Sequence, residues 1–210
     1  MVNMEGGSRM KLLYGTGNPA KISSMRKKLS GLDIEMIGLR DLNLEIPEIV
    51  EDGTSPLENA VKKAHGYYEV FKMPVFSCDT GLYFEELPEE LQPGIHVRNV
   101  KGKRLSDSEM ITYYTGLVKE YGNLHGRYWN AICFILDREH QYAAMDETLA
   151  SARFLLTSQP HKVVKEGFPL DSLSIDLDSG QYFYDVKQKD VDQGSTQGFL
   201  EFFKNVLKLN

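Results

Sequence analysis

The first half of the chain alternates short apolar segments with amphipathic helical patterns, and this alternation limits the fold more than any other feature. Met10–Tyr14 is apolar and typical of a buried strand. A glycine-containing break follows it, then Asn18 and Pro19, which favour an N-cap and a first helical position. Residues 74–78 repeat the strand pattern, and residues 81–85 continue it. Strands that alternate with helices indicate an α/β protein.

Other segments extend this pattern along the chain. Two helices are predicted to begin at capping boxes, Ser55 to Glu58 and Ser106 to Glu109. The alternation over residues 128–136 predicts a long strand and the first arm of an antiparallel hairpin, and apolar residues from 199 to 207 predict a C-terminal helix. Residues 142–156 are ambiguous, because their apolar residues also fit helical spacing.

Length and composition narrow the class of protein. The 210 residues suffice for one large domain, or for two small lobes that share one. A net charge of -6 argues against binding a nucleic-acid polymer, whereas a small polyanion would need a local basic pocket or a metal. Two cysteines make no disulfide framework, and no apolar run reaches the roughly 18 residues of a membrane span. We therefore expect a cytoplasmic protein, with a polar extension at residues 1–9 and one domain over residues 10–210.

The GTGNPAK segment at residues 15–21 is a candidate anion-binding loop. A strand enters a glycine-containing turn and a helix begins, so backbone N–H groups and the helix end favour a bound anion. Thr16 and Asn18 offer further donors, and Lys21 lies on the first helical turn. The spacing differs from that of a Walker A loop. The alternative is an ordinary capped helix with a solvated lysine.

Two acids are candidate ligands of a divalent ion. Glu51 lies just before the second helix, on which Lys63 follows Asn59 on the same face. Asp79 ends a buried strand, a common place for site residues in α/β proteins. The alternatives are acids that favour the helix dipole and an Asx-turn that closes the strand. The five histidines show no metal-ligand spacing, and Cys78 lacks an evident partner for nucleophilic catalysis.

Taken in order, four segments resemble one family. The segments are GTGNPAK, EDGTSPLENAVKKA, PVFSCDTGLYFEEL and PGIHVRN, within residues 10–136. They are similar to the Ham1-like inosine triphosphate pyrophosphatase family, which hydrolyses non-canonical purine nucleoside triphosphates. The resemblance implies a long twisted mixed sheet with flanking helices, two lobes around a central cleft, and a homodimer. It also favours strands over a helix for residues 142–156.

The resemblance implies roles for individual residues. Thr16, Asn18, Lys21 and Lys63 would bind the triphosphate, with Thr80 beside Asp79, and Glu51 and Asp79 would bind Mg²⁺. Cleavage between the α and β phosphates needs neutralised charge and an aligned water. Asp79 would activate or position that water, and Lys21 and Lys63 would stabilise the departing pyrophosphate.

The second half of the chain departs from the family. Where the family has G-F-G-[YW]-D-P, this sequence keeps Phe168, which could stack on a base, and Asp171, but has Pro169 and Leu170 between them. The Ser-His-Arg motif is replaced by GSTQ at residues 194–197, whose Thr196 and Gln197 could recognise a different base. The sequence therefore predicts metal-dependent hydrolysis of a nucleoside triphosphate to a monophosphate and pyrophosphate, with base and sugar preference open. A non-catalytic nucleotide-binding or regulatory protein, altered base specificity and an unrelated α/β protein are the alternatives.

Overall fold

The computed structural model describes residues 9–186 and 193–208. The polar extension expected at residues 1–9 lies outside the described residues except for Arg9, which pairs with Asp33.

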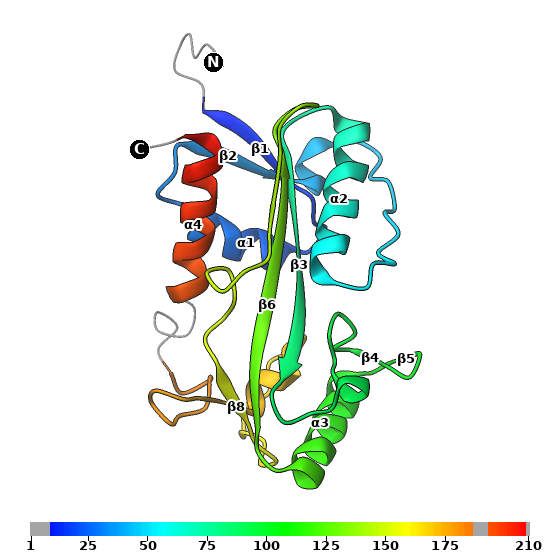
Figure 1. Cartoon of the computed structure of the whole chain (residues 1–210), viewed down its shortest axis with the longest axis vertical. Helices are drawn as coiled ribbons and strands as arrows, with labels where there is room; N and C mark the ends of the chain where they lie inside the picture. The colour runs from blue at the N-terminus through cyan, green and yellow to red at the C-terminus, as the bar shows by residue number, and fades with distance from the viewer. Residues whose placement is uncertain (1–8, 187–192, 209–210) are drawn as a thin grey trace. The chain divides into compact units, whose positions relative to one another are not determined.

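One mixed sheet of seven strands is flanked by helices, as the sequence predicts for an α/β fold (Figure 1). The strand order is β2-β1-β3-β6-β8-β9, with β7 also paired to β6. Strand β1 pairs in parallel with β2 and β3, whereas β6–β7, β6–β8 and β8–β9 are antiparallel. The strands of this sheet are β1 (Met10–Tyr14), β2 (Ile34–Gly38), β3 (Val75–Phe84), β6 (Leu124–Ile135), β7 (Gln141–Ala144), β8 (Phe154–Leu156) and β9 (Ser174–Asp176).

Helices and a separate two-stranded ribbon complete the described elements. The α-helices are α1 (Pro19–Lys28), α2 (Pro56–Phe71), α3 (Asp107–Tyr121) and α4 (Gln193–Leu207). The ribbon is β4 (Asn99–Val100) with β5 (Lys103–Arg104), and single 3₁₀ turns are η1 (Leu39–Leu42), η2 (Glu89–Leu91) and η3 (Pro169–Ser172). None of the described helices is both long enough and apolar enough to span a membrane.

The ambiguous residues 142–156 contain parts of two strands and no helix. The chain turns from β6 into β7, and Phe134 faces Tyr142 across this antiparallel hairpin. After a connecting segment, β8 pairs with the other end of β6. The strand interpretation is therefore confirmed, and the helical spacing of the apolar residues is incidental.

The chain divides into two compact units, and two strands contribute to both. The first unit comprises the described residues of Met1–Asp79, Ala131–Leu149 and Thr196–Asn210, and the second comprises Thr80–Asn130 and Ala150–Ser195. Strand β3 passes from the first unit to the second after Asp79, and β6 returns after Asn130. The crossings lie within strands, so neither has the composition of a linker.

In the first unit, helices cover both faces of the sheet. Figure 1 shows α1 and α4 on one face and α2 on the other. Successive side chains of a strand point to opposite faces, and β1 follows this rule. Leu12 and Tyr14 pack with α1 and α4, whereas Leu13 packs with α2. The loop that follows β1 bonds to β3 through the Gly15 N–H and the Phe76 carbonyl, and Asn59 links the loop before α2 to Asp79 of β3.

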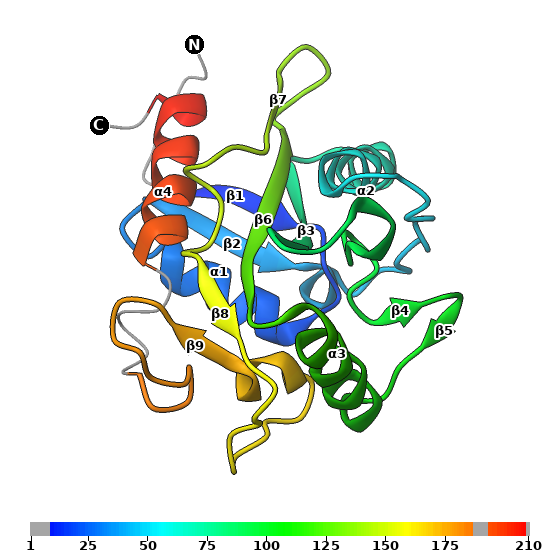
Figure 2. The same cartoon turned by 60° about the horizontal axis from the view of Figure 1, so that its bottom comes forward.

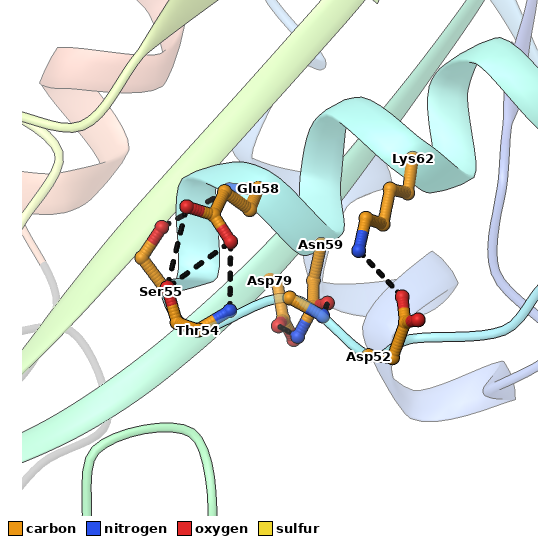
Figure 3. Close-up of polar contacts among 8 residues, drawn as sticks. Asp52, Thr54, Ser55, Glu58, Asn59, Lys62 and Asp79 are labelled. Atoms are coloured by element: carbon orange, nitrogen blue, oxygen red, sulfur yellow. Dashed lines mark hydrogen bonds and ion pairs between the residues drawn. The ribbon is translucent and has the colours of Figure 1, made fainter.

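Side-chain caps fix the starts of the helices. The Asn18 side chain accepts the backbone N–H of Ala20, 2.9 Å away, at the start of α1. At α2 the expected capping box is wrong in one half: Ser55 accepts from the Glu58 N–H, but the Glu58 carboxylate accepts the N–H of Thr54, at 2.7 Å, instead of returning to Ser55 (Figure 3). The Glu58 carboxylate therefore bonds to Thr54, the residue before the N-cap Ser55.

The second unit has its own core around α3 (Figure 2). The capping box from Ser106 to Glu109 is complete here, and the helix ends at Gly122, whose φ of 84° suits glycine. Tyr114 is fully buried against Phe84, and its hydroxyl donates to the carbonyl of Val97.

Candidate functional site

The loop between β1 and α1 is packed tightly at its first glycine and open at its second. The Gly15 N–H donates to the Phe76 carbonyl at 2.7 Å. A Cβ on Gly15 would lie 2.3 Å from the Ser77 hydroxyl and 2.5 Å from the Tyr67 ring, so only glycine fits this approach. A Cβ on Gly17 would meet nothing within 4 Å. Gly15 is therefore structural, whereas Gly17 lies where a ligand has room to approach the backbone.

The side chains of this loop have partly committed hydrogen-bonding groups. The Asn18 oxygen caps α1, so its amide N–H groups are the part that would reach an anion. The Thr16 hydroxyl accepts the Asn18 N–H at 3.2 Å, which leaves the hydroxyl proton to be donated. Lys21 is exposed on the first turn of α1. Three of the four side chains predicted to bind the triphosphate are thus at or just before the start of α1, with donors to offer.

A buried lysine joins the two predicted metal ligands. The Lys63 ammonium lies 2.7 Å from a Glu51 oxygen and 3.6 Å from an Asp79 oxygen. The Lys63 and Asp79 side chains are 9% and 15% exposed, whereas Glu51 is 46% exposed. The three side chains come from the loop before α2, from α2 itself and from β3. The structure therefore brings these three predicted residues together in the first unit.

A buried asparagine connects the same segments. The Asn59 side chain, 3% exposed, donates to Asp79 at 3.1 Å and accepts the Gly53 N–H at 2.8 Å. Figure 3 shows Asn59 between the loop and Asp79, with Lys62 directed away toward Asp52. Asn59 and Gly53 were not among the predicted site residues. The two partners of Asn59, Gly53 and Asp79, are 6 and 20 residues from it in sequence, so local spacing gives no signal for these contacts.

Tyr14 and Cys78 lie buried in the strands that carry the site. Burial, with lesser effects of Cys78 and Asp79, raises the pKa of Tyr14 well above its ordinary value. Burial raises the pKa of the Cys78 thiol to about 12, although the charges of Lys21 and Lys63 oppose this shift. Both lysines therefore act electrostatically on one buried thiol. Cys78 is a neutral thiol, as expected for a residue without a nucleophilic role.

The remaining predicted residues belong to the second unit. The Thr80 hydroxyl donates to the Asn130 side chain at 2.9 Å, so Thr80 is held within that unit. The Phe168 ring is 43% exposed, with the Lys165 ammonium 5.1 Å from its centroid. Asp171 follows in the 3₁₀ turn η3. Phe168 and Asp171 thus both belong to the second unit, whereas the cluster around Lys63 belongs to the first.

Asp171 has an unusual environment for a carboxyl group. Burial raises its pKa to about 6, and the Lys165 charge only partly opposes this. Asp171 in turn contributes to the raised pKa of half-buried Tyr128. Perturbed carboxyl groups concentrate at functional sites, although structural groups also show such shifts.

Residues 194–197 form the start of α4, where the family motif is missing. Ser195 is buried, and the exposed Gln197 amide donates to Glu201 one turn further along the helix, at 2.8 Å. A base that used Gln197 would have to displace this contact.

A second group of potential ligands lies in the second unit. Glu85, Glu86 and His125 offer ligand atoms within 4.8 Å of one another. The sequence separation of 39 between Glu86 and His125 explains why histidine spacing did not reveal the group. Glu86 already contacts His125, and Glu85 pairs with Arg153, so these carboxylates are engaged with cationic or polar partners.

Comparison with known proteins places the chain in a family. The model of the Ham1 family matches residues 12–153. The chain belongs to the Ham1 family. It is 34% identical over 101 residues to a dITP/XTP pyrophosphatase of Oceanobacillus iheyensis, covering 48% of this chain and 50% of that protein. It is 31% identical over 113 residues to a protein of the same description from Halorhodospira halophila, covering 54% and 55%. The chain thus spans about half the length of these curated relatives.

Solved Ham1 structures share the fold over nearly the whole chain. The HAM1 protein of Coxiella burnetii aligns with a TM-score of 0.75 at 19% identity, covering 96% of this chain and 100% of that one. The Ham1 protein of Staphylococcus aureus aligns with a TM-score of 0.73 at 15% identity, covering 93% and 98%. The Ham1 sequence match includes the loop at residues 15–21, Glu51, Lys63 and Asp79, but ends before Phe168.

Proposed function

We propose that this chain hydrolyses a nucleoside triphosphate to a nucleoside monophosphate and pyrophosphate, with a divalent ion. The observation that carries the proposal is the buried Lys63 ammonium between the carboxylates of Glu51 and Asp79. Membership of the Ham1 family supports the reaction, and the relatives described as dITP/XTP pyrophosphatases support a purine substrate with a non-canonical base.

The carboxylates of Glu51 and Asp79 fit a divalent ion. Both approach one positive charge, the Lys63 ammonium, so the fold already accommodates a cation between them. Carboxylate oxygens are the hard ligands that Mg²⁺ prefers. When bound by these two residues, the ion would neutralise phosphate charge and polarise phosphorus.

The reaction assigns a task to each nearby side chain. A water attacks the α-phosphorus, the bond from this phosphorus to the bridging oxygen breaks, and pyrophosphate leaves. The Asp79 carboxylate, which accepts a hydrogen bond from Asn59 and lies 3.6 Å from the Lys63 ammonium, takes the proton from that water. Lys21 stabilises the negative charge of the leaving pyrophosphate, with Thr16 and Asn18 donating to its oxygens. The Lys63 ammonium joins them when phosphate oxygens replace the carboxylates as its partners.

We assign recognition of the base to Phe168 and Asp171, with Thr80 part of the substrate site. The exposed Phe168 ring offers a surface for stacking, and Asp171 offers an acceptor or, when protonated, a donor. One observation favours altered base specificity over that of the named relatives: residues 194–197 lack histidine and arginine, and Gln197 is engaged with Glu201. The homodimer implied by the resemblance and the cytoplasmic location expected from the two cysteines also belong to this proposal.

The decisive experiment is release of pyrophosphate from a panel of canonical and non-canonical nucleoside triphosphates, with Mg²⁺ and with a chelator. Asp79→Asn and Glu51→Gln are expected to abolish turnover. Asp52→Asn is the matched control, because Asp52 is next to Glu51 but pairs with the exposed Lys62. Release that depends on Mg²⁺, Glu51 and Asp79 but not on Asp52 supports the proposal. Nucleotide binding without turnover would instead identify a non-catalytic nucleotide-binding protein.

A further inference from the structure

Asn59 is a hydrogen-bonded partner shared by the loop that carries Glu51 and the strand that carries Asp79. Its side chain is 3% exposed and bonds both to the Gly53 N–H and to Asp79. A buried amide with both ends bonded has one orientation, because reversing it would leave donors facing donors. Asn59 therefore links segments that are far apart in sequence.

The orientation of the amide determines what Asp79 receives. The backbone N–H of Gly53 is a donor, so it must face the Asn59 oxygen, and the amide N–H groups then face Asp79. One Asp79 oxygen is thereby held by Asn59, and the other lies toward Lys63. This division fixes the rotation of the carboxylate and leaves one oxygen directed toward the Lys63 and Glu51 side.

Gly53 shows how little room this link allows. A Cβ on Gly53 would lie 2.6 Å from the Asn59 side-chain oxygen and 2.8 Å from the Glu58 Cβ. A methyl group would thus push Asn59 away from the loop without changing any polar group.

We propose that Asn59 is the positioning residue that sets the separation and orientation of Glu51 and Asp79 for a divalent cation. It touches neither substrate nor cation, and acts by holding the Asp79 carboxylate while anchoring the loop that follows Glu51. The inference rests on the proposed function only in taking these two carboxylates as the cation ligands. Hydrogen-bonding partners of metal ligands typically contribute about 10–100-fold to metal affinity or activity.

The test measures binding of Mn²⁺ alone, without nucleotide, by the electron paramagnetic resonance signal of the free ion. Asn59→Ala is expected to weaken Mn²⁺ binding by about tenfold or more. Gly53→Ala is expected to weaken it in the same direction, because it displaces the same amide. Lys62→Met is the matched control on the same helix, since Lys62 points outward to Asp52, and it is expected to stay within about twofold.

Thermal unfolding of each variant shows whether it is folded, and so separates a positioning role from loss of the fold. A folded Asn59→Ala protein that binds Mn²⁺ as the parent does overturns the proposal. Equal weakening by Lys62→Met also overturns it, as does a parent protein that does not bind Mn²⁺. In turnover, a positioning role lowers kcat more than it raises KM. If the parent binds Mn²⁺ but hydrolyses no nucleotide, while Asn59→Ala loses Mn²⁺, the proposed function fails and this inference stands. If the parent hydrolyses nucleotide and Asn59→Ala binds Mn²⁺ as tightly as the parent, this inference fails and the proposed function stands.

Discussion

Replacing Asp171 by asparagine is predicted to stabilise the second unit at neutral pH. Burial raises the pKa of Asp171 to about 6, against an ordinary value of 3.8. A carboxyl whose pKa is raised by folding binds more protons in the folded than in the unfolded chain between these values. The free energy of unfolding therefore falls as pH rises through this window, and the whole cost is present above it. Asparagine has nearly the same shape and carries no charge.

The size of the effect follows from the shift. About 2 pKa units at 1.36 kcal/mol each give roughly 3 kcal/mol at pH 7.5, and the same linkage gives about 1 kcal/mol at pH 4.5. Asp171→Asn should therefore gain about 2 kcal/mol more over the parent at the higher pH than at the lower. Water that reaches the partly buried carboxyl would reduce both figures, so they are upper limits.

Urea unfolding at the two pH values measures this difference directly. The single tryptophan of the chain, Trp129, lies in the second unit, so its fluorescence reports on the unit that contains Asp171. Asp107→Asn is the control of opposite sign, because Asp107 accepts from the Gly167 N–H and Arg98, which lower its pKa. An Asp171→Asn protein that is no more stable than the parent at pH 7.5, or whose gain is the same at both pH values, would refute the reasoning.

Three further predictions concern the first unit. In the parent, a cation that binds Glu51 has to break the charge-assisted hydrogen bond from Lys63, worth about 1.5 kcal/mol. Lys63→Met removes this hydrogen bond and should therefore tighten binding of Mn²⁺ alone by about tenfold. Unchanged or weaker binding in the resonance assay would contradict this. Gly15→Ala should lose about 1–3 kcal/mol in urea unfolding through overpacking, whereas Gly17→Ala should stay within about 0.5 kcal/mol; equal losses would be inconsistent with the packing. The Cys78 thiol, with a pKa of about 12, should react with a thiol reagent at pH 8 only as fast as the unit opens, and rapid labelling of the folded protein would count against its burial.

Local sequence signals located much of the fold because they are local in origin. The apolar segment Met10–Tyr14 is β1 as predicted, and the cap at Ser106 starts α3. They failed for residues 142–156, where helical spacing competed with strand pairing to β6, and pairing decided the outcome. The boundary between the two units has no local signal in the sequence either, because the chain passes between them inside β3 and β6 and not through a linker.

The candidate site could be predicted in part for a related reason. Glu51, Lys63 and Asp79 were each visible as residues of suitable chemistry, and the family resemblance put them together. Their convergence depends on the parallel pairing of β1 with β3 and on the packing of α2 over these strands. The hydrogen bonds of Asn59 depend on the same tertiary arrangement, so no pattern in the sequence could assign its role.

The match to the Ham1 family stops before the segment proposed to recognise the base. The charged cluster around Lys63 lies before this boundary, and the proposed base-binding residues lie after it. The matched part contains Lys63 and the two carboxylates, and removing one of these charges would leave the others without their partner. Asp171 lies beyond the match and is predicted to destabilise its unit at neutral pH, so folding gives no reason for a carboxyl group at this position. Changes in base preference should therefore appear mainly in KM across the nucleotide panel, while substitutions around Lys63 should appear mainly in kcat. A panel in which kcat varied widely at constant KM would mean that the base also controls alignment of the phosphates.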